Sequence, residues 1–349
     1  MINKEIEAAG CKILKKLQLL DINSLHISDY NKKYLGGFGF SSQFQKGIKA
    51  KIKYFLKKYI LRRKYPKQYI QIMNVLLQDK KINDLQNMSF LDHGGGTGLL
   101  SLLAAELGFG YVYYNDIYDV SCNDSACISE ILGYNSIIRI SGDFNEIKNY
   151  CSKHDVLFNC IGSYDVIEHI YDINGFLESI ASICAPKSMV FLLSGANSYN
   201  KSIVKELSTT HEKIENENRE YTFGHKERDS LQSYVSIRAE IIKNEYKAQY
   251  LPEPIDEEME TLVKSTRGLI HQDIKKAIQL YITKGILPQA DIDFPTNTCD
   301  PLTGNWAEHL MDFSKLLIIL KKSFNNCFIF PDVKKLPKAK RIGLFASNE

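Results

Sequence analysis

The segment that most constrains the fold is a glycine-dense turn between an apolar run and an apolar helix. Residues 89–92 form a β-like run, residues 94–98 read Gly-Gly-Gly-Thr-Gly, and a Leu- and Ala-rich stretch continues to Gly108. A strand that passes through such a turn directly into a helix is typical of an open parallel sheet, where the ligand crevice lies at the carboxyl ends of the strands. The turn therefore predicts an α/β protein with a ligand site at that edge.

Short apolar runs alternate with helix-like segments through residues 85–197, which predicts a parallel sheet covered by helices on both faces. The expected strands are residues 89–92, 111–114, 137–140, 155–159, 189–193, 327–330 and 342–346, and a further helix is expected over residues 306–322. Four stretches follow from this pattern. They are an N-terminal helical, basic extension (1–84), the core (85–197), a helical insert (198–299), and a C-terminal helix with strands that complete the core (300–349).

The composition excludes several other classes of protein. No run of about 18 uncharged apolar residues is present, so a transmembrane helix is not expected. The acidic start of the chain leads into no apolar stretch, which is unlike a secretory signal, and the eight cysteines contain no Cys-x-x-Cys pair. We therefore expect a cytoplasmic protein with free thiols.

The spacing within the glycine turn indicates what it binds. Asp92, Gly94, Gly96 and Gly98 form the pattern Asp-x-Gly-x-Gly-x-Gly. A phosphate-binding P-loop would need a lysine at the start of the helix, and none is present. An acid before the loop would face the pyrophosphate of a dinucleotide, whereas it suits a cationic ligand that carries an α-amino group.

At these residues the chain resembles the class I S-adenosylmethionine-dependent methyltransferases. The resemblance implies a Rossmann-like, seven-stranded, mostly parallel sheet, in which Asp92 and the glycine backbone hold the amino acid part of the cofactor. It also implies that Asp116, at the end of the second strand, binds the ribose hydroxyls. Asp143 and Phe144, after the third strand, would then contact the adenine.

After the fourth strand, the segment from Asp165 to His169 resembles the Glu-His segment of the ubiquinone-type O-methyltransferases. Glu168 and His169 are therefore the expected catalytic residues near the acceptor, with His169 as a general base. The alternative is a divalent metal held by Asp165, Glu168 and His169. The first acid is Asp rather than the Glu of the metal-binding relatives, so metal is the less favoured alternative.

The helical insert is the expected substrate lid. Its polar candidates are His211, Arg219, His225, Arg228, Arg238, Arg267 and His271. Arg267, beside Gly268, could clamp a carboxylate or a phosphate, or else belong to a solvated face. A turn at Asp300-Pro301 and Gly304 would bring Trp306 and His309 to the sheet edge. There Trp306 would either stack on a substrate ring or pack the insert on the core.

A basic segment stands apart from the rest of the chain. Between Tyr30 and Gln78 there are twelve Lys and Arg residues and no acid, while the whole chain carries a net charge of +3, so the remainder carries −9. Residues 46–64 show helical spacing of apolar residues with basic residues on the other faces. This helix could dock on the acidic remainder, lie on an anionic membrane or bind nucleic acid.

The resemblance implies a methyltransferase, and around Glu168 and His169 it implies one that methylates an oxygen of a small-molecule, saccharide or lipid-linked acceptor. Peripheral contact with the inner face of a membrane through residues 46–64 is preferred to contact with nucleic acid. The alternatives are an RNA or protein methyltransferase that docks through the basic segment, and a cofactor-binding scaffold without turnover.

Overall fold

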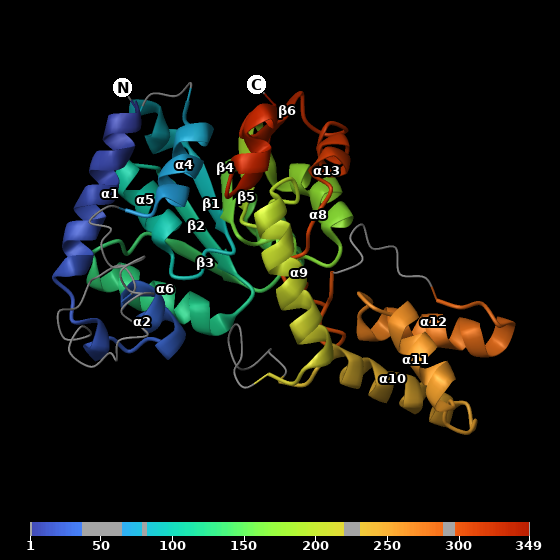
Figure 1. Cartoon of the computed structure of the whole chain (residues 1–349). Coiled ribbons are helices and arrows are strands. Elements are labelled where there is room, and N and C mark those ends of the chain that lie inside the picture. The colour runs from blue at the N-terminus through green and yellow to red at the C-terminus, as the bar shows by residue number, and fades with distance from the viewer. Residues whose placement is uncertain (1, 37–64, 79–81, 220–230, 289–296, 349) are drawn as a thin grey trace.

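The centre of the protein is a single twisted sheet (Figure 1). The computed structural model describes residues 2–36, 65–78, 82–219, 231–288 and 297–348, and within them seven strands form this sheet in the order β3-β2-β1-β4-β5-β7-β6. The strands are β1 (Ser89–His93), β2 (Tyr111–Asp116), β3 (Ile138–Ser141), β4 (Phe158–Tyr164), β5 (Cys184–Ser194), β6 (Asn326–Phe330) and β7 (Ile342–Ser347). Strand β7 alone runs in the direction opposite to the other six strands. The predicted fold class is confirmed.

Two of the expected elements were misplaced. The fourth strand was expected over 155–159 but spans 158–164, because Asp155 ends the preceding helix in a left-handed conformation with φ 53°. The helix expected over 306–322 is wrong for its first seven residues. It begins only after Asp312, whose side chain accepts hydrogen bonds from the N–H groups of Ser314 and Lys315 as an N-cap.

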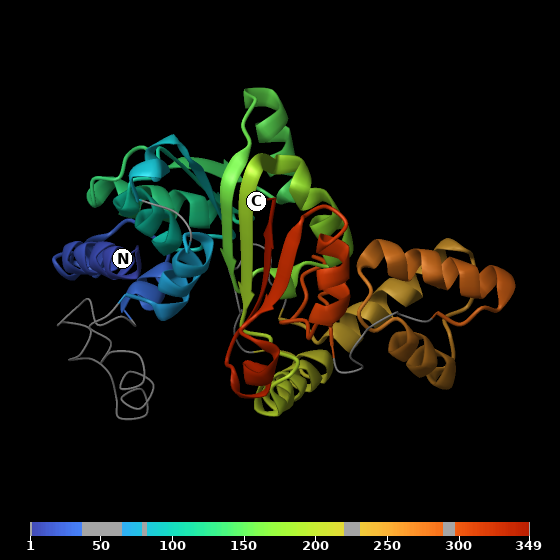
Figure 2. The same cartoon turned by 90° about the horizontal axis from the view of Figure 1, so that it is seen from above.

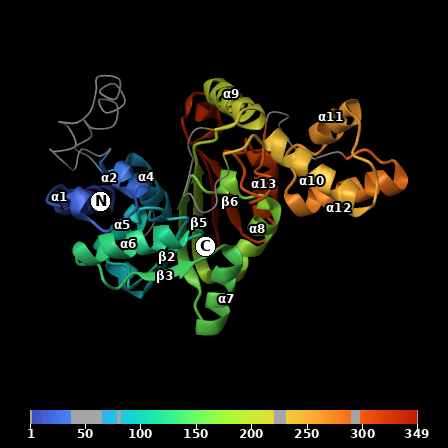
Figure 3. The same cartoon turned by 90° about the horizontal axis from the view of Figure 1, so that it is seen from below.

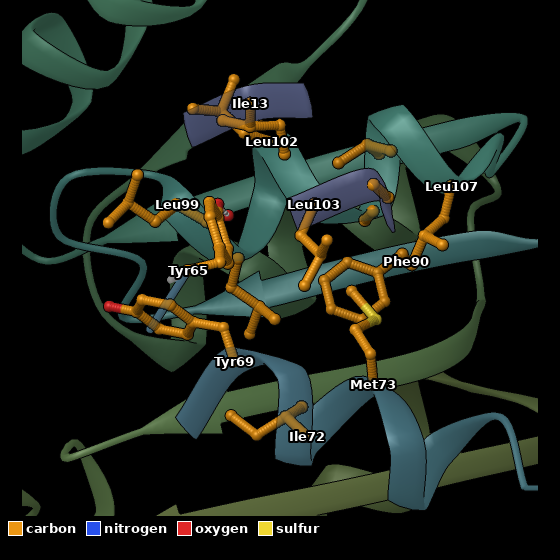
Figure 4. Packing of buried hydrophobic residues seen from close by; sticks show 14 of the residues in the cluster. Ile13, Tyr65, Tyr69, Ile72, Met73, Phe90, Leu99, Leu102, Leu103 and Leu107 are labelled. Carbon is orange, nitrogen blue, oxygen red and sulfur yellow. Dashed lines mark hydrogen bonds between the residues drawn. The ribbon is translucent and has the colours of Figure 1, made fainter. Parts of the chain in front are cut away.

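Alternate residues of the central strands face opposite layers of helices, as the pleat requires. Phe90 packs in one apolar cluster with helices α1 (Ile2–Gln18), α4 (Lys67–Leu76), α5 (Leu99–Leu107) and α6 (Asp119–Ile131). Figure 4 shows Phe90 between Met73 of α4 and Leu103 of α5. Because Asp92 lies two residues after Phe90, its side chain faces the same layer.

The opposite face carries the second cluster. Leu91 packs there with side chains of α7 (Phe144–His154), α8 (Ile173–Ser179) and α13 (Phe313–Leu320). Figure 3 shows α7, α8 and α13 on the side of the sheet away from α1 and α5. His93 follows Leu91 by two residues and therefore faces this layer.

The insert has an apolar core of its own. It consists of α9 (Lys201–Asn216), α10 (Tyr234–Ala248), α11 (Asp256–Ser265) and α12 (His271–Lys284). Residues of α10, α11 and α12 pack with Ile214 near the end of α9 in a cluster separate from the two sheet layers. Helix α9 runs beside the sheet and leads to this group, which projects away from the sheet (Figure 2).

The predicted basic helix over residues 46–64 lies outside the described residues, as do His225 and Arg228 of the insert. Among the residues that the structure describes, no helix is long and apolar enough to cross a membrane.

Candidate functional site

The glycine turn after β1 depends on left-handed backbone conformations. Gly94, Gly96 and Gly98 have φ values of 67°, 53° and 75°, which glycine adopts at little steric cost. The N–H of Gly95 donates to the carbonyl oxygen of Asn115 (2.8 Å), and that of Gly98 donates to the carbonyl oxygen of Gly95 (2.8 Å). The turn is therefore tied to the end of β2 and delivers the chain into α5 at a fixed angle.

Gly96 forms the open face of this turn. A Cβ atom built on Gly96 would have no atom within 4 Å, whereas one on Gly94 would collide with Val166. The N–H of Gly96 donates to Oδ2 of Asp116 (3.0 Å), and the hydroxyl of Tyr114 donates to the carbonyl oxygen of Gly96 (2.7 Å). The backbone at Gly96 is thus fixed by hydrogen bonds and borders open space. This arrangement suits a ligand that lies against the backbone.

Asp92 is buried behind the turn. Its Oδ2 accepts hydrogen bonds from the N–H (2.9 Å) and the hydroxyl (2.7 Å) of Ser101 in α5. Burial raises the pKa of Asp92 to about 7, against the opposing effect of the Ser101 hydrogen bonds. A carboxyl with this pKa gains charge when a cation approaches, because a nearby positive charge favours its ionised form.

Asp116 ends β2 beside Gly96. Its Oδ1 accepts from the N–H of Tyr118 (3.0 Å), and its backbone carbonyl accepts from the N–H of Gly142 (2.9 Å). The carboxyl is therefore oriented by two backbone N–H groups, those of Gly96 and Tyr118. We call Asp92, the turn 94–98 and Asp116 the glycine rim.

Asp143 and Phe144 start helix α7 next to this rim. The Oδ1 atom of Asp143 accepts from the N–H groups of Asn145 (2.9 Å) and Glu146 (3.3 Å), so this exposed side chain serves as an N-cap. The ring of Phe144 packs edge-on against Phe176 with centroids 4.8 Å apart. Their assignment to the adenine stays a prediction.

His93 and Asn115 join the glycine rim to α7 and α8. Asn115 donates from Nδ2 to the carbonyl oxygens of Ile140 and Gly142 (2.9 Å each) and pairs its Oδ1 with Nδ1 of His93 (2.9 Å). The His93 ring stacks on Phe176 at 5.3 Å, and burial lowers the pKa of His93 to about 4. Neither residue was predicted from the sequence. The alternation of β1 alone would have placed the His93 side chain on the face of the sheet opposite to that of Asp92.

Helix α2 (Asp29–Gly36) is held against helix α6 at its start. Buried Asp124 of α6 accepts hydrogen bonds from the N–H of Ser28 (3.0 Å) and from Nδ2 of Asn31 (2.7 Å), which fixes the start of α2. Between them, Tyr30 has a raised pKa, caused by burial and then by the charges of Asp116 and Asp165. Nothing in the sequence pattern singled out Tyr30, because its position depends on the distant Asp124.

The second group of candidates follows β4. Asp165 has φ 53°, and its Oδ1 accepts from the N–H of Gly195 (2.6 Å), which also lies 3.3 Å from Oε1 of Glu168. Glu168 is buried, and burial together with the charge of Asp165 raises its pKa well above the ordinary value. The Oε1 atom of Glu168 is therefore directed at the residue that follows β5.

His169 is held by a residue from the far end of the chain. Its Nδ1 lies 2.8 Å from the carbonyl oxygen of Trp306, 137 residues away in sequence. Because a carbonyl oxygen only accepts, Nδ1 carries the hydrogen and Nε2 of the neutral ring is the acceptor. We call residues 165–169 with residues 306–309 the histidine rim.

The segment before Trp306 forms the predicted turn. Oδ1 of Asp300 accepts from the N–H groups of Leu302 (2.8 Å) and Thr303 (3.0 Å), and Gly304 has φ 74°. Trp306 is buried, and its ring stacks on His309 at 4.3 Å and on Tyr171 at 6.0 Å. Of the two alternatives for Trp306, the structure favours packing of the insert on the core.

The charged candidates of the insert are used internally. Arg238 is buried, pairs with Glu215 and donates from Nε to the carbonyl oxygen of Val263 (3.1 Å). Arg267 donates to Glu212 (2.9 Å) and to the carbonyl oxygen of Asn297 (3.1 Å), so it braces the loop rather than standing open as a clamp. His211 is buried, Arg219 lies 5.8 Å from the Tyr234 ring, and His271 begins α12.

The described part of the chain contains no group of three His, Cys, Asp or Glu side chains placed to hold a metal ion. Asp165 and Glu168 instead converge on the N–H of Gly195, and the Nδ1 atom of His169 is bonded to Trp306. The metal alternative therefore finds no preformed site in these residues.

One protein-family model matches this chain. Residues 61–238, about half of the chain, match the family model described as a methyltransferase domain. No match to a curated protein sequence was found.

Similar solved structures include a putative SAM-dependent methyltransferase from Streptococcus mutans (17% identity, 36% of each chain, TM-score 0.29). TrmN from Thermus thermophilus matches at 20% identity over 32% of this chain and 36% of its own, with a TM-score of 0.26. SMU.776, a putative methyltransferase complexed with SAH, matches at 16% identity over 40% and 38%, with a TM-score of 0.32. The matches thus span less than two fifths of the length of each of these structures. By its family match, its sheet order and its glycine rim, the chain belongs to the methyltransferase domain family and has the class I fold of the S-adenosylmethionine-dependent methyltransferases.

Proposed function

We propose that this chain transfers a methyl group from S-adenosylmethionine to a hydroxyl oxygen of a small-molecule, saccharide or lipid-linked acceptor, with His169 as the general base. The observation that carries the proposal is the hydrogen bond from Nδ1 of His169 to the Trp306 carbonyl oxygen (2.8 Å). That bond directs the basic nitrogen, Nε2, away from Trp306. A histidine held in this tautomer is suited to remove a hydroxyl proton near neutral pH.

The glycine rim fits the cofactor. The open backbone of Gly96 can receive its amino acid part. Asp92 lies behind the turn, and its pKa is raised to about 7. Asp116 offers carboxylate oxygens for ribose hydroxyls. When bound, S-adenosylmethionine supplies an electrophilic methyl group on a positively charged sulfur. The protein's part is to orient the acceptor in line with that methyl group and to keep water away.

The histidine rim would accept the proton of the acceptor hydroxyl. As the new O–C bond forms and the S–C bond breaks, the hydroxyl proton passes to Nε2 of His169, while Nδ1–H stays bonded to Trp306. Glu168, next to His169 in the chain, is buried, and its Oε1 accepts from the N–H of Gly195 (3.3 Å). The proton then leaves to solvent, and S-adenosylhomocysteine and the methyl ether are the products.

The test is transfer of a labelled methyl group from S-adenosylmethionine to a panel of hydroxylated small molecules, saccharides and lipid extracts, with total RNA and protein as competing acceptors. We expect labelled ethers, and we expect His169→Gln to lower kcat by about 10²–10⁴-fold, as loss of a general base does. Calorimetry should show unchanged S-adenosylhomocysteine affinity in that variant. His154→Gln, on the outer end of α7, is the matched control.

The proposal fails if the label enters RNA or protein instead, or if His169→Gln retains full activity on a hydroxylated acceptor. Absence of S-adenosylhomocysteine binding at millimolar ligand would contradict the cofactor assignment itself. The peripheral membrane contact proposed for residues 46–64 is tested separately, by co-sedimentation with anionic vesicles at two salt concentrations. Added salt should weaken that binding.

A further inference from the structure

The loop between β6 and β7 brings positive charge to the edge of the sheet that bears the candidate site. Ile342, the first residue of β7, pairs with Ser194 at the end of β5, so the residues just before it lie at the carboxyl ends of the parallel strands. Residues 333–341 contain no acid and five basic side chains, those of Lys334, Lys335, Lys338, Lys340 and Arg341. We call residues 334–341 the basic loop.

The basic loop is fixed to the segment that follows β5. Buried Asn197 donates from Nδ2 to the carbonyl oxygens of Leu336 and Ala339 (2.9 Å each). Asn200, the N-cap of α9, also donates to the carbonyl oxygen of Ala339 (2.9 Å). Figure 3 shows this part of the chain, in red, beside α9. These bonds use only backbone atoms of the loop, so they fix its path without occupying its charged side chains.

Arg341, the last residue of the basic loop, is half-buried and is held by two neutral side chains. Its Nε donates to the hydroxyl oxygen of Tyr164 (3.2 Å), and its Nη2 donates to Oε1 of Gln68 in α4 (3.4 Å). Its guanidinium carbon lies 5.4 Å from the centroid of the Tyr164 ring. These contacts use the inner edge of the guanidinium, so the outer edge, formed by Nη1 and Nη2, keeps N–H donors for a further partner.

The positive charge of Arg341 has no carboxylate partner in the part of the chain that the structure describes. The ion pairs found there involve other cations, and none includes a residue of the basic loop. Asp165, next to Tyr164 in the chain, directs its Oδ1 at the N–H of Gly195 (2.6 Å) instead. Because a partly buried charge without a counter-ion is costly, an anion at the outer edge of Arg341 would offset that cost.

From this arrangement we infer that Arg341 binds a phosphate group of the methyl acceptor, with the lysines of the basic loop adding positive charge around it. The inference rests on the proposed function and narrows its acceptor to a phosphorylated hydroxyl compound, either a saccharide phosphate or a lipid headgroup. The two outer nitrogens of a guanidinium match two oxygens of an oxyanion. A phosphate monoester carries about two negative charges near neutral pH, so nearby lysines favour it over a carboxylate.

The position of Tyr164 relates this phosphate site to the reaction. Tyr164 ends β4 and directly precedes Asp165, the first residue of the histidine rim. An acceptor phosphate at Arg341 would therefore lie beside the strand that leads to His169. It would hold the acceptor at that edge while one of its hydroxyl groups reacts.

Binding of inorganic pyrophosphate, measured by calorimetry at about 0.15 M salt, tests the site without turnover. We expect Arg341→Gln to weaken this binding about 10–100-fold, because charge-assisted hydrogen bonds are lost. Arg341→Lys keeps the charge but loses the planar fork, so its affinity should be intermediate. Lys322→Gln is the control, since it removes one exposed positive charge that pairs with Glu178 and lies before the start of β6, at the other edge of the sheet. It should bind normally.

Circular dichroism gives the melting temperature of each variant and separates unfolding from loss of binding. Where Arg341→Gln melts below the assay temperature, Arg341→Lys serves for the comparison with the native chain, and its affinity should still be lower.

The methyl-transfer assay identifies the source of the phosphate. Saccharide phosphates are compared with their parent saccharides, and phosphatidylglycerol with diacylglycerol in the same micelles. We expect the phosphorylated member of one pair to have a kcat/KM at least about 10-fold higher than its partner. Arg341→Gln should raise the KM for that acceptor about 10–100-fold with little change in kcat, because a contact kept throughout the reaction acts on binding alone. The KM for S-adenosylmethionine should not change.

The inference is overturned if pyrophosphate does not bind at millimolar concentration, or if it binds equally well to the native chain and to both Arg341 variants. Equal use of phosphorylated and unphosphorylated acceptors would also overturn it. These results leave the base role of His169 standing. Label found in protein would contradict the proposed function and the acceptor assignment together, whereas pyrophosphate binding that depends on Arg341 would still support the oxyanion site.

Discussion

The glycine rim and the histidine rim meet at one edge of the sheet but are assembled differently. The glycine rim is joined by bonds between neighbouring strands, such as that from the Gly96 N–H to Asp116, 20 residues on. The histidine rim is joined by the bond between His169 and Trp306, 137 residues apart. The first is a product of the core sheet, whereas the second requires the chain to return through the whole insert.

This difference teaches that the two halves of the site can be disturbed separately. The anchor of residues 297–309 is Glu215 of α9, which pairs with buried Arg238 of α10 and accepts from the hydroxyl of Thr298. Asn297 exchanges hydrogen bonds with the backbone of Leu310 (3.1 and 3.2 Å). The histidine rim thus depends on the packing of the insert, and the glycine rim does not.

The largest effect is expected from breaking the anchor. Arg238→Met should lower the free energy of unfolding by about 3 kcal/mol, because it leaves the buried Glu215 carboxylate with only the Thr298 hydroxyl and a longer contact to Arg267 (3.9 Å). Urea denaturation measures the loss, and calorimetry should find the S-adenosylhomocysteine affinity of the folded fraction unchanged. Lys243→Met, which breaks the exposed pair with Glu253, should cost no more than about 1 kcal/mol. A large loss of cofactor affinity in Arg238→Met would contradict the separation.

The next effect belongs to the glycine rim. Asp116→Asn should weaken S-adenosylhomocysteine binding about 10–100-fold, since hydrogen bonds to a charged group contribute about 1.5–3 kcal/mol. Asp155→Asn, at the end of α7, is the control and should bind normally. Normal binding by Asp116→Asn would refute the ribose assignment.

Asp92 and His93 should give opposite pH dependences of stability. The pKa of Asp92 is raised to about 7, so its contribution to stability is present below pH 4 and is lost as the pH rises toward 7. The pKa of His93 is lowered to about 4, so stability is lost as the pH falls from 6.5 toward 4. Between pH 4.5 and 6 the two slopes oppose each other.

Single substitutions isolate the contribution of each residue to the pH dependence of the free energy of unfolding. Asp92→Asn should make stability rise with pH in that window, and His93→Gln should make it fall, each by up to about 1.4 kcal/mol per pH unit. Urea titrations at pH 4.5 and 6 provide the measurement. Equal slopes in both variants would show that burial does not perturb these groups.

The smallest effect distinguishes backbone strain from ligand contact. Gly96 and Gly108 both have positive φ with open space where a Cβ would lie. Gly96→Ala and Gly108→Ala should therefore each cost about 1 kcal/mol of stability. Only Gly96→Ala should weaken S-adenosylhomocysteine binding. Equal affinities in the two variants would remove Gly96 from the cofactor site.

Local pattern together with the family resemblance was enough to predict which residues form the glycine rim. Asp92, the glycines and Asp116 lie at the ends of adjacent parallel strands, so the order of elements along the chain already brings them together. Their partners were less accessible. Ser101 bonds Asp92, and Asn115 links His93 to Gly142, through side-chain geometry that periodicity does not specify.

The histidine rim was predicted only in part. The resemblance indicated Glu168 and His169, but it did not indicate that Glu168 is buried or that Trp306 sets the tautomer of His169. The positive φ of Glu308 (49°) was not predicted, because the helix expected from residue 306 onward would have given this residue ordinary helical dihedral angles. The N-cap at Asp312, and the hydrogen bonds from the N–H groups of Trp306 and His309 to the carbonyl oxygens of His169 and Glu168, keep that helix from starting earlier.

The sequence by itself determined the sheet, the glycine turn and the acids beside it, because those depend on alternation, on glycine conformation and on neighbours a few residues apart. Only the tertiary structure decided that Trp306 contacts His169, that Asp124 holds Ser28 and Asn31, and that Arg238 and Arg267 are occupied within the insert. These contacts join residues up to 137 apart, and they form only when separate clusters pack against one another. These long-range contacts are stabilised by that packing, and a local sequence pattern does not specify it.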